Sequence, residues 1–143
     1  VSITSATILF RPTTDTASVG LLFYPGAMVE PQAYAPMARA IAEAGYMVAI
    51  LDRPFRLAPF ARHRDQLAQR TAALMREDSR QRAWVVGGHS KGGALAATFA
   101  RDYASDLAGL VLIGTSHPRE DDLSMLELDV TKIYASEDGL ASE

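Results

Sequence analysis

Apolar residues fall into six short runs that are separated by polar stretches, and three longer segments between these runs repeat their apolar residues at helical spacing. The run over 46–51 is almost continuously apolar, which is typical of a strand that is buried on both faces. The predicted helices end near residue 44, span about 60–77, and reach from about 91 to 103. The predicted strands cover residues 3–10, 19–24, 46–51, 83–86, 110–113 and 130–135.

The alternation of these strands and helices predicts an α/β fold. Its sheet should be mostly parallel and doubly wound, with helices on both faces. At 143 residues the chain has the length of a single domain, and we treat residues 1–143 as one unit. Sheets of this kind bind ligands beyond the carboxyl ends of their strands. Polar residues that directly follow a predicted strand are therefore the candidate site residues.

Composition narrows the function further. The chain has no cysteine, which excludes disulfides, thiolate catalysis and thiolate metal sites. A net charge of −3 gives no reason to expect a nucleic-acid partner. The apolar runs are interrupted by proline or charge and are too short to span a membrane. No targeting signal is visible, so we expect a cytoplasmic protein, although the start at Val1 rather than methionine is compatible with an upstream segment.

The most specific motif is the run Gly88-His89-Ser90-Lys91-Gly92, which has the pattern Gly-x-Ser-x-Gly between a predicted strand and a predicted helix. Small neighbours allow a sharp turn that presents the serine hydroxyl at the end of the strand. Backbone N–H groups at the start of the helix can stabilise an oxyanion. The motif therefore predicts that Ser90 is a nucleophile. The alternative is a glycine-rich turn that serves only close packing of helix and sheet.

With this motif in place, the chain resembles the α/β-hydrolases, and most of all the small branch without a cap domain that includes dienelactone hydrolases and bacterial esterases. The resemblance implies a serine hydrolase that cleaves a carboxylic ester, a thioester or a lactone through an acyl-enzyme. It also implies a small-molecule substrate and no cofactor. The stretches that carry the resemblance follow the family's order along the chain and cover residues 21–26, 34–38, 87–93 and 134–139.

The resemblance assigns further roles at the site. It implies that Asp138, after the last predicted strand, is the acid of a catalytic triad; the alternative is an aspartate that only forms a turn before glycine. It implies an oxyanion hole made by the backbone N–H groups of Lys91 and Ala27, with Gly26 allowing close approach of the backbone. A Ser90–Lys91 dyad is a further alternative, although adjacent side chains at such a turn point in different directions.

The triad of this fold ends with a histidine that follows the acid, and no histidine follows Asp138. We expect His89 to line the pocket or to serve structure, and His63 to lie on a solvated helix face. His117 follows a strand and is the one internal substitute for the base. We therefore expect that the chain is the middle of a longer protein without its first strand and its last strand and helix. Its histidine would follow Glu143, and the chain alone would be inactive or weak.

Three remaining features concern partners. Arg53 and Arg56 follow a strand near the expected site, where they could orient an anionic group of the substrate; the alternative is a pair of surface arginines. Three scattered histidines without a ligand-spaced carboxylate cluster give little support for a metal. The strand over 130–135 is expected near an open sheet edge, which favours a homodimer. The alternative function is that of a non-catalytic protein with the hydrolase fold, which binds a ligand or partner at the same rim, beyond the carboxyl ends of the strands.

Overall fold

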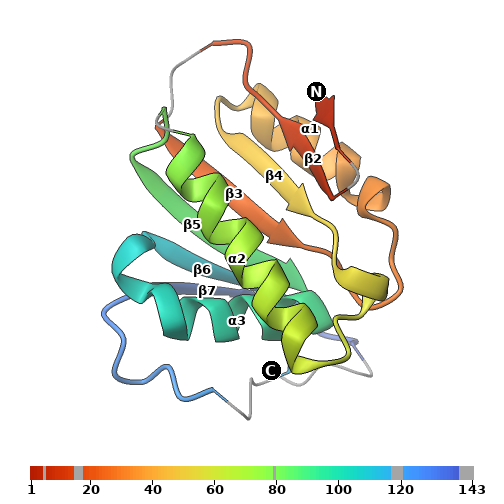
Figure 1. Cartoon of the computed structure of the whole chain (residues 1–143), viewed down its shortest axis with the longest axis vertical. Coiled ribbons are helices and arrows are strands. Elements are labelled where there is room, and N and C mark those ends of the chain that lie inside the picture. Colours follow the sequence, from red (N-terminus) through yellow and green to blue (C-terminus); the bar gives the residue numbers. More distant parts are fainter. Residues whose placement is uncertain (5, 15–17, 79, 117–120, 139–143) are drawn as a thin grey trace.

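The described part of the chain forms one sheet of seven strands. The computed structural model describes residues 1–4, 6–14, 18–78, 80–116 and 121–138. The strands lie in the order β1-β2-β4-β3-β5-β6-β7 (Figure 1). All pairs from β4 to β7 are parallel, and only the pairs of β2 are antiparallel. The strands are β1 (Ser2–Ile3), β2 (Thr7–Phe10), β3 (Val19–Tyr24), β4 (Met47–Leu51), β5 (Ala83–His89), β6 (Gly109–Ile113) and β7 (Asp129–Ile133).

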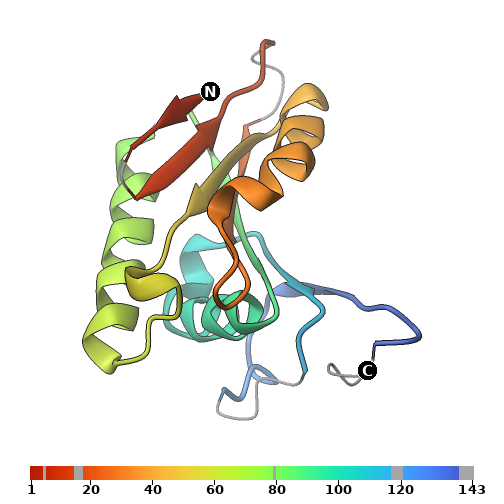
Figure 2. The same cartoon turned by 90° about the vertical axis from the view of Figure 1, so that its right-hand side faces the viewer.

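Helices cover both faces of the sheet, as the alternation of elements predicts. The helix α1 (Ala35–Glu43) packs on one face, and α2 (Ala61–Glu77) and α3 (Lys91–Tyr103) pack on the other (Figure 2). A short 3₁₀ helix, η1 (Pro31–Tyr34), leads into α1, and a second, η2 (Pro54–Arg56), follows β4. The predicted α/β fold with a mostly parallel sheet is confirmed.

The strand β4 shows how the sequence specifies two cores. All five of its residues are buried. Met47, Ala49 and Leu51 belong to the cluster beneath α2 and α3, whereas Val48 and Ile50 belong to the cluster beneath α1. Successive side chains of a strand point to opposite faces, so a continuously apolar run fills both layers. The predicted burial of this strand on both faces is therefore confirmed.

The amino-terminal segment differs from the expected single strand over 3–10. It is divided into β1 and β2, which pair as an antiparallel hairpin with Ser2 opposite Leu9 and Ile3 opposite Ile8. The hydroxyl of Thr4 accepts a hydrogen bond from the N–H of Thr7 at 3.1 Å, and this bond closes the turn. Threonine has a high strand propensity, which conceals the turn from a reading of the apolar pattern.

At the other end of the described sheet, β7 pairs with β6 alone. Val130 and Ile133 on this strand are each 50% exposed. An edge strand with exposed apolar side chains can pair with a second copy of the chain. The homodimer stays a prediction.

The expectation for His63 is wrong. This residue of α2 is only 4% exposed, and its ring lies 5.1 Å from that of Phe55 and 5.3 Å from that of Phe60. The N–H at Nε of Arg62 donates to its Nε2 at 3.3 Å. Charged sequence neighbours suggested a solvated face, but the aromatic residues of the loop before α2 fold back over the histidine.

A buried carboxylate joins the segments after β2 and after α2 at the opposite end of the sheet from the predicted site. Asp78, directly after α2, accepts a hydrogen bond from Arg11 at 2.7 Å and two from Arg80 at 3.2 Å. Burial alone would raise the pKa of the Asp78 carboxyl, but the hydrogen bonds from the two arginines outweigh it, so its pKa lies below the usual value. The ionised form is therefore favoured in the folded protein.

We predict that Asp78→Asn destabilises the fold at neutral pH by about 1–2 kcal/mol, through the loss of charge-assisted hydrogen bonds. A lowered folded-state pKa contributes stability that is complete above the unfolded value of about 3.9 and is lost as the pH falls through the folded value. The difference in the free energy of unfolding between Asp78→Asn and wild type should therefore decrease below about pH 4. Urea unfolding at pH 7 and pH 3 measures this difference, and Asp129→Asn is the control because Asp129 is exposed. A difference that does not change with pH would contradict this account.

Candidate functional site

Ser90 lies between the end of β5 and the start of α3, with backbone angles φ 52° and ψ −120°. A positive φ is uncommon for a residue other than glycine and is found most often where the surrounding structure enforces it. The side chain is exposed, and its hydroxyl makes no hydrogen bond with any residue that the structure describes. The serine is thus held out from the sheet on a strained turn.

Hydrogen bonds on both sides of the turn maintain this backbone. The N–H of Ser90 donates to the carbonyl of Ile113 on β6 at 2.9 Å. Its carbonyl accepts from the hydroxyl of Thr115 at 2.8 Å, and from the N–H groups of Gly93 and Ala94 at 2.9 and 3.2 Å. The peptide groups of the serine are therefore anchored both to the neighbouring strand and to the first turn of α3.

Two glycines of the motif allow the helix to approach the sheet closely. A Cβ atom on Gly92 would lie 2.1 Å from the carbonyl oxygen of Tyr24 and 2.2 Å from that of Pro25, both at the end of β3. A Cβ atom on Gly88 would lie 2.3 Å from the backbone of Gly92. Any side chain at these positions would push α3 away from the sheet and would displace Ser90.

Two backbone N–H groups at this rim are the predicted oxyanion donors. Lys91 is the first residue of α3, so its N–H has no acceptor within the helix. The N–H of Ala27, in the loop after β3, likewise has no partner among the described residues. The side chain of Lys91 is exposed and makes no hydrogen bond to Ser90. The helix start and the loop both offer hydrogen-bond donors where the positive end of a helix dipole favours negative charge.

The loop after β3 is held by side chains from two other segments. The N–H of Gly26 donates to the hydroxyl of Tyr34 at 2.8 Å, and the Gly26 carbonyl accepts from Nη2 of Arg53 at 2.5 Å. Arg53 is 2% exposed, so the alternative of a surface arginine is wrong for it, whereas contact with an anionic group of the substrate stays a prediction. Burial lowers the pKa of its guanidinium, and the nearby Asp52 opposes the shift. Arg56, by contrast, is exposed and pairs with Glu30 at 2.6 Å.

His89 and Asp138 lie beside the same glycine. A Cβ atom on Gly114 would be 3.5 Å from Nε2 of His89 and 3.7 Å from Oδ2 of Asp138. The other ring nitrogen of His89, Nδ1, lies 2.9 Å from the hydroxyl of Tyr34. The imidazole therefore faces the loop after β3 on one side and the acid on the other. Its ring makes no hydrogen bond to Ser90 among the described residues, and His117 lies outside them.

Sequence reasoning places Thr115 at this end of the sheet but misses the role of Tyr34. The apolar ring of Tyr34 packs against Phe23 at a centroid distance of 5.0 Å. Its hydroxyl nevertheless serves the loop after β3. Thr115 directly follows a predicted strand, and that position was the available signal for it.

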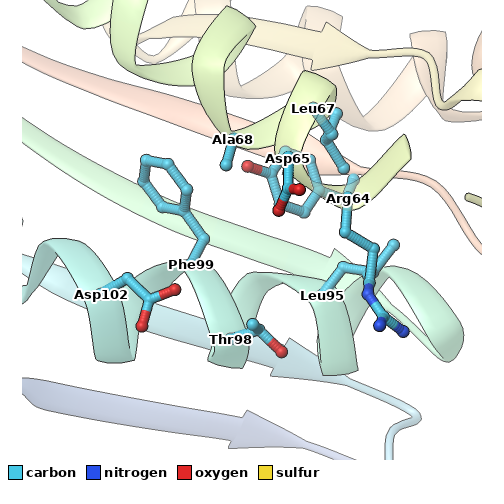
Figure 3. Close-up of a pocket in the computed structure, with 9 residues that line it drawn as sticks. Arg64, Asp65, Leu67, Ala68, Leu95, Thr98, Phe99 and Asp102 are labelled. Carbon is cyan, nitrogen blue, oxygen red and sulfur yellow. The ribbon is translucent and has the colours of Figure 1, made fainter. Parts of the chain in front are cut away.

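The cavity drawn in Figure 3 is separate from this rim. It lies between α2 and α3, has a volume of about 50 Å³ and is lined by Leu67, Leu95 and Phe99 together with charged residues such as Arg64. None of the predicted site residues lines it, and its size suits one or two water molecules. This cavity is therefore distinct from the predicted site around Ser90.

Neither a metal site nor a membrane span is present among residues 1–138, apart from the gaps given above. Over those ranges, no three histidine or acidic side chains lie together in a way that could hold a metal ion. No helix there combines the length and the apolar character needed to cross a bilayer.

Comparison with known proteins adds a family and a set of similar folds. The family described as "Alpha/beta hydrolase family" matches residues 20–143. A probable hydrolytic enzyme from Pseudomonas aeruginosa PAO1 is 26% identical, with a TM-score of 0.64 over 76% of this chain and 36% of that chain. A highly thermostable carboxyl esterase from Bacillus coagulans is 21% identical, with a TM-score of 0.61 over 77% of this chain and 39% of that chain.

A monoglyceride lipase from Saccharomyces cerevisiae, at 14% identity and a TM-score of 0.69, is matched over 81% of this chain and 44% of that chain. The chain thus spans between about a third and less than half of the length of these three structures. A comparison with curated protein sequences gives no match.

We predict that Gly92→Ala destabilises the protein by about 1–3 kcal/mol, because its methyl group would overlap two carbonyl oxygens of β3. Helix propensity alone predicts the opposite sign, a gain of up to about 1 kcal/mol. The free energy of unfolding in urea therefore distinguishes the two effects. Gly109→Ala is the milder comparison, since a Cβ there would approach the carbonyl oxygen of Asp129 to 3.3 Å rather than 2.1 Å. A Gly92→Ala protein as stable as the Gly109→Ala protein would show that the close approach of α3 is not required.

Proposed function

Because the chain belongs to the α/β-hydrolase family, we propose that it carries the nucleophile of a serine hydrolase, and that Ser90 is that nucleophile. The observation that carries this proposal is the exposed hydroxyl on a left-handed turn at the start of α3. A glycine-rich turn used only for packing has no need of a strained serine. The proposed substrate is a small carboxylic ester, thioester or lactone, in keeping with the esterases and lipases among the similar structures.

The proposed reaction begins when Ser90 Oγ attacks the substrate carbonyl and a base takes the hydroxyl proton. The carbonyl oxygen becomes an oxyanion, which the N–H groups of Lys91 and Ala27 stabilise. The oxyanion then collapses and breaks the bond between the carbonyl carbon and the leaving oxygen or sulfur. The base gives its proton to that atom to form an alcohol or thiol, and an acyl-enzyme on Ser90 remains. Water, deprotonated by the same base, hydrolyses the acyl-enzyme and restores the serine.

Asp138 is the proposed acid that orients the base. It follows β7, and β6 alone separates β7 from β5 in the sheet. Two strand spacings amount to about 10 Å, which is too far for direct contact with Ser90 and suits an imidazole ring between the two side chains. Neither His63 nor His89 makes a hydrogen bond to the Ser90 hydroxyl. The proposed base is therefore a histidine outside the described residues.

The surface around Ser90 is exposed at the start of α3 and in the loop after β3. Residues 114–116 and 121–128 of the β6–β7 connection contain no helix. Ser90, Lys91 and Ala27 are all exposed. We therefore propose that the carbonyl of a small ester reaches the exposed serine directly.

Ser90→Ala tests the proposal in the full natural protein. We expect labelling by a fluorophosphonate probe to disappear, and hydrolysis of p-nitrophenyl acetate to fall by about a thousandfold or more. Ser136→Ala is the matched control, because Ser136 is an exposed serine in the turn before Asp138. It should keep wild-type labelling.

Labelling that persists in Ser90→Ala would place the nucleophile elsewhere. Wild-type protein that neither reacts with the probe nor hydrolyses the ester would favour a non-catalytic binding protein instead.

A further inference from the structure

The peptide groups of Gly26 are held from two directions. Its N–H donates to the hydroxyl of Tyr34, at the end of η1, over 2.8 Å. Its carbonyl accepts from Nη2 of Arg53, just beyond β4, and from the N–H of Val29 at 3.1 Å. The loop between β3 and η1 therefore depends on side chains that lie 8 and 27 residues away along the chain.

The bond to the Gly26 carbonyl also determines the direction of the next N–H. The carbonyl of Gly26 and the N–H of Ala27 belong to one planar trans peptide, in which the two groups point in opposite directions. When Arg53 binds the carbonyl from inside the protein, the N–H of Ala27 is directed away from the arginine. That N–H has no acceptor among the described residues, so it is available to a ligand.

We infer that Arg53 and Tyr34 are positioning residues, which hold the Gly26–Ala27 peptide so that the N–H of Ala27 serves as an oxyanion donor. The inference rests on the proposed function of Ser90. It assigns to Arg53 a role that does not require contact with substrate, in accord with its exposure of only 2%.

The cost of burying Arg53 supports a role of this kind. Its Nε and Nη1 are buried and have no hydrogen-bond partner among the described residues. A buried guanidinium with unpaired N–H groups is unfavourable for stability, and an apolar side chain of similar volume would fill the space at lower cost. The bond that the arginine does make is the one to the Gly26 carbonyl. We therefore assign the burial of Arg53 to its role in orienting the Gly26–Ala27 peptide.

Tyr34 extends the same network to the residue before the nucleophile. Its hydroxyl accepts the Gly26 N–H and lies 2.9 Å from Nδ1 of His89, and the tautomer of His89 decides which of these two atoms donates. A Cβ atom on Gly26 would lie 2.6 Å from Nδ1 of His89, so only glycine fits between the loop and the ring.

Steady-state kinetics of the full natural protein with p-nitrophenyl acetate tests the role in catalysis. Tyr34→Phe and Arg53→Lys should each lower kcat by about 10- to 100-fold and leave KM within about twofold, because an oxyanion donor acts mainly in the transition state. Tyr46→Phe and Arg39→Lys are the matched controls, since both residues are exposed. They should retain the wild-type kcat. If Tyr34→Phe and Arg53→Lys both keep the wild-type kcat while Ser90→Ala abolishes activity, the positioning role is overturned and the proposed function stands.

Amide hydrogen exchange tests this positioning role without reference to activity. The Gly26 amide should exchange at least about tenfold faster in Tyr34→Phe than in wild type, because its acceptor is removed. The Tyr46→Phe control should not change this rate. Equal exchange rates of the Gly26 amide in wild type and Tyr34→Phe would show that Tyr34 does not hold this peptide. A wild-type protein whose Gly26 amide is protected but that hydrolyses no ester would overturn the proposed function. The catalytic role of Arg53 and Tyr34 would then be overturned with it.

Discussion

The left-handed backbone at Ser90 is the constraint on which the rest of the site depends. A serine with φ 52° carries strain of about 1–3 kcal/mol, which the surrounding structure must sustain. It does so through hydrogen bonds to β6 and α3, and through the contact of Gly92 with the end of β3. Because the parallel strands bring their carboxyl ends to one edge, the same packing that maintains the turn also places the loop after β3 and the loop after β7 near it.

The rim combines strained backbone with polar groups that are costly to bury. Arg53 is enclosed beneath the loop after β3, and Tyr34, His89 and Gly26 form a continuous set of contacts around it. The two apolar clusters on either face of the sheet supply the stability against which these costs are set. The rigid sheet thus allows a loop, a helix start and an acid from separate parts of the chain to be held in fixed relative positions.

Sequence reasoning succeeded where local pattern and packing agree. The apolar run over 46–51 predicted the buried strand β4, and the glycines around Ser90 predicted a sharp turn. Both succeed because a buried strand and a sharp turn each need particular residue types. Sequence reasoning did not predict the burial of His63 and Arg53, which depends on which loops fold over them. No periodicity in the chain shows that the loop before α2 covers a histidine, or that an arginine after β4 reaches a glycine 27 residues earlier.

A crystal structure of the full natural protein after reaction with a phosphonate ester tests the central claim most directly. The account predicts a covalent bond from Ser90 Oγ to phosphorus, with φ of Ser90 still positive. It also predicts that the phosphonyl oxygen lies within about 3.2 Å of the backbone nitrogens of both Lys91 and Ala27. A phosphonate bound to another residue, or an oxygen turned to solvent with Ala27 N–H pointing away from it, would contradict the account.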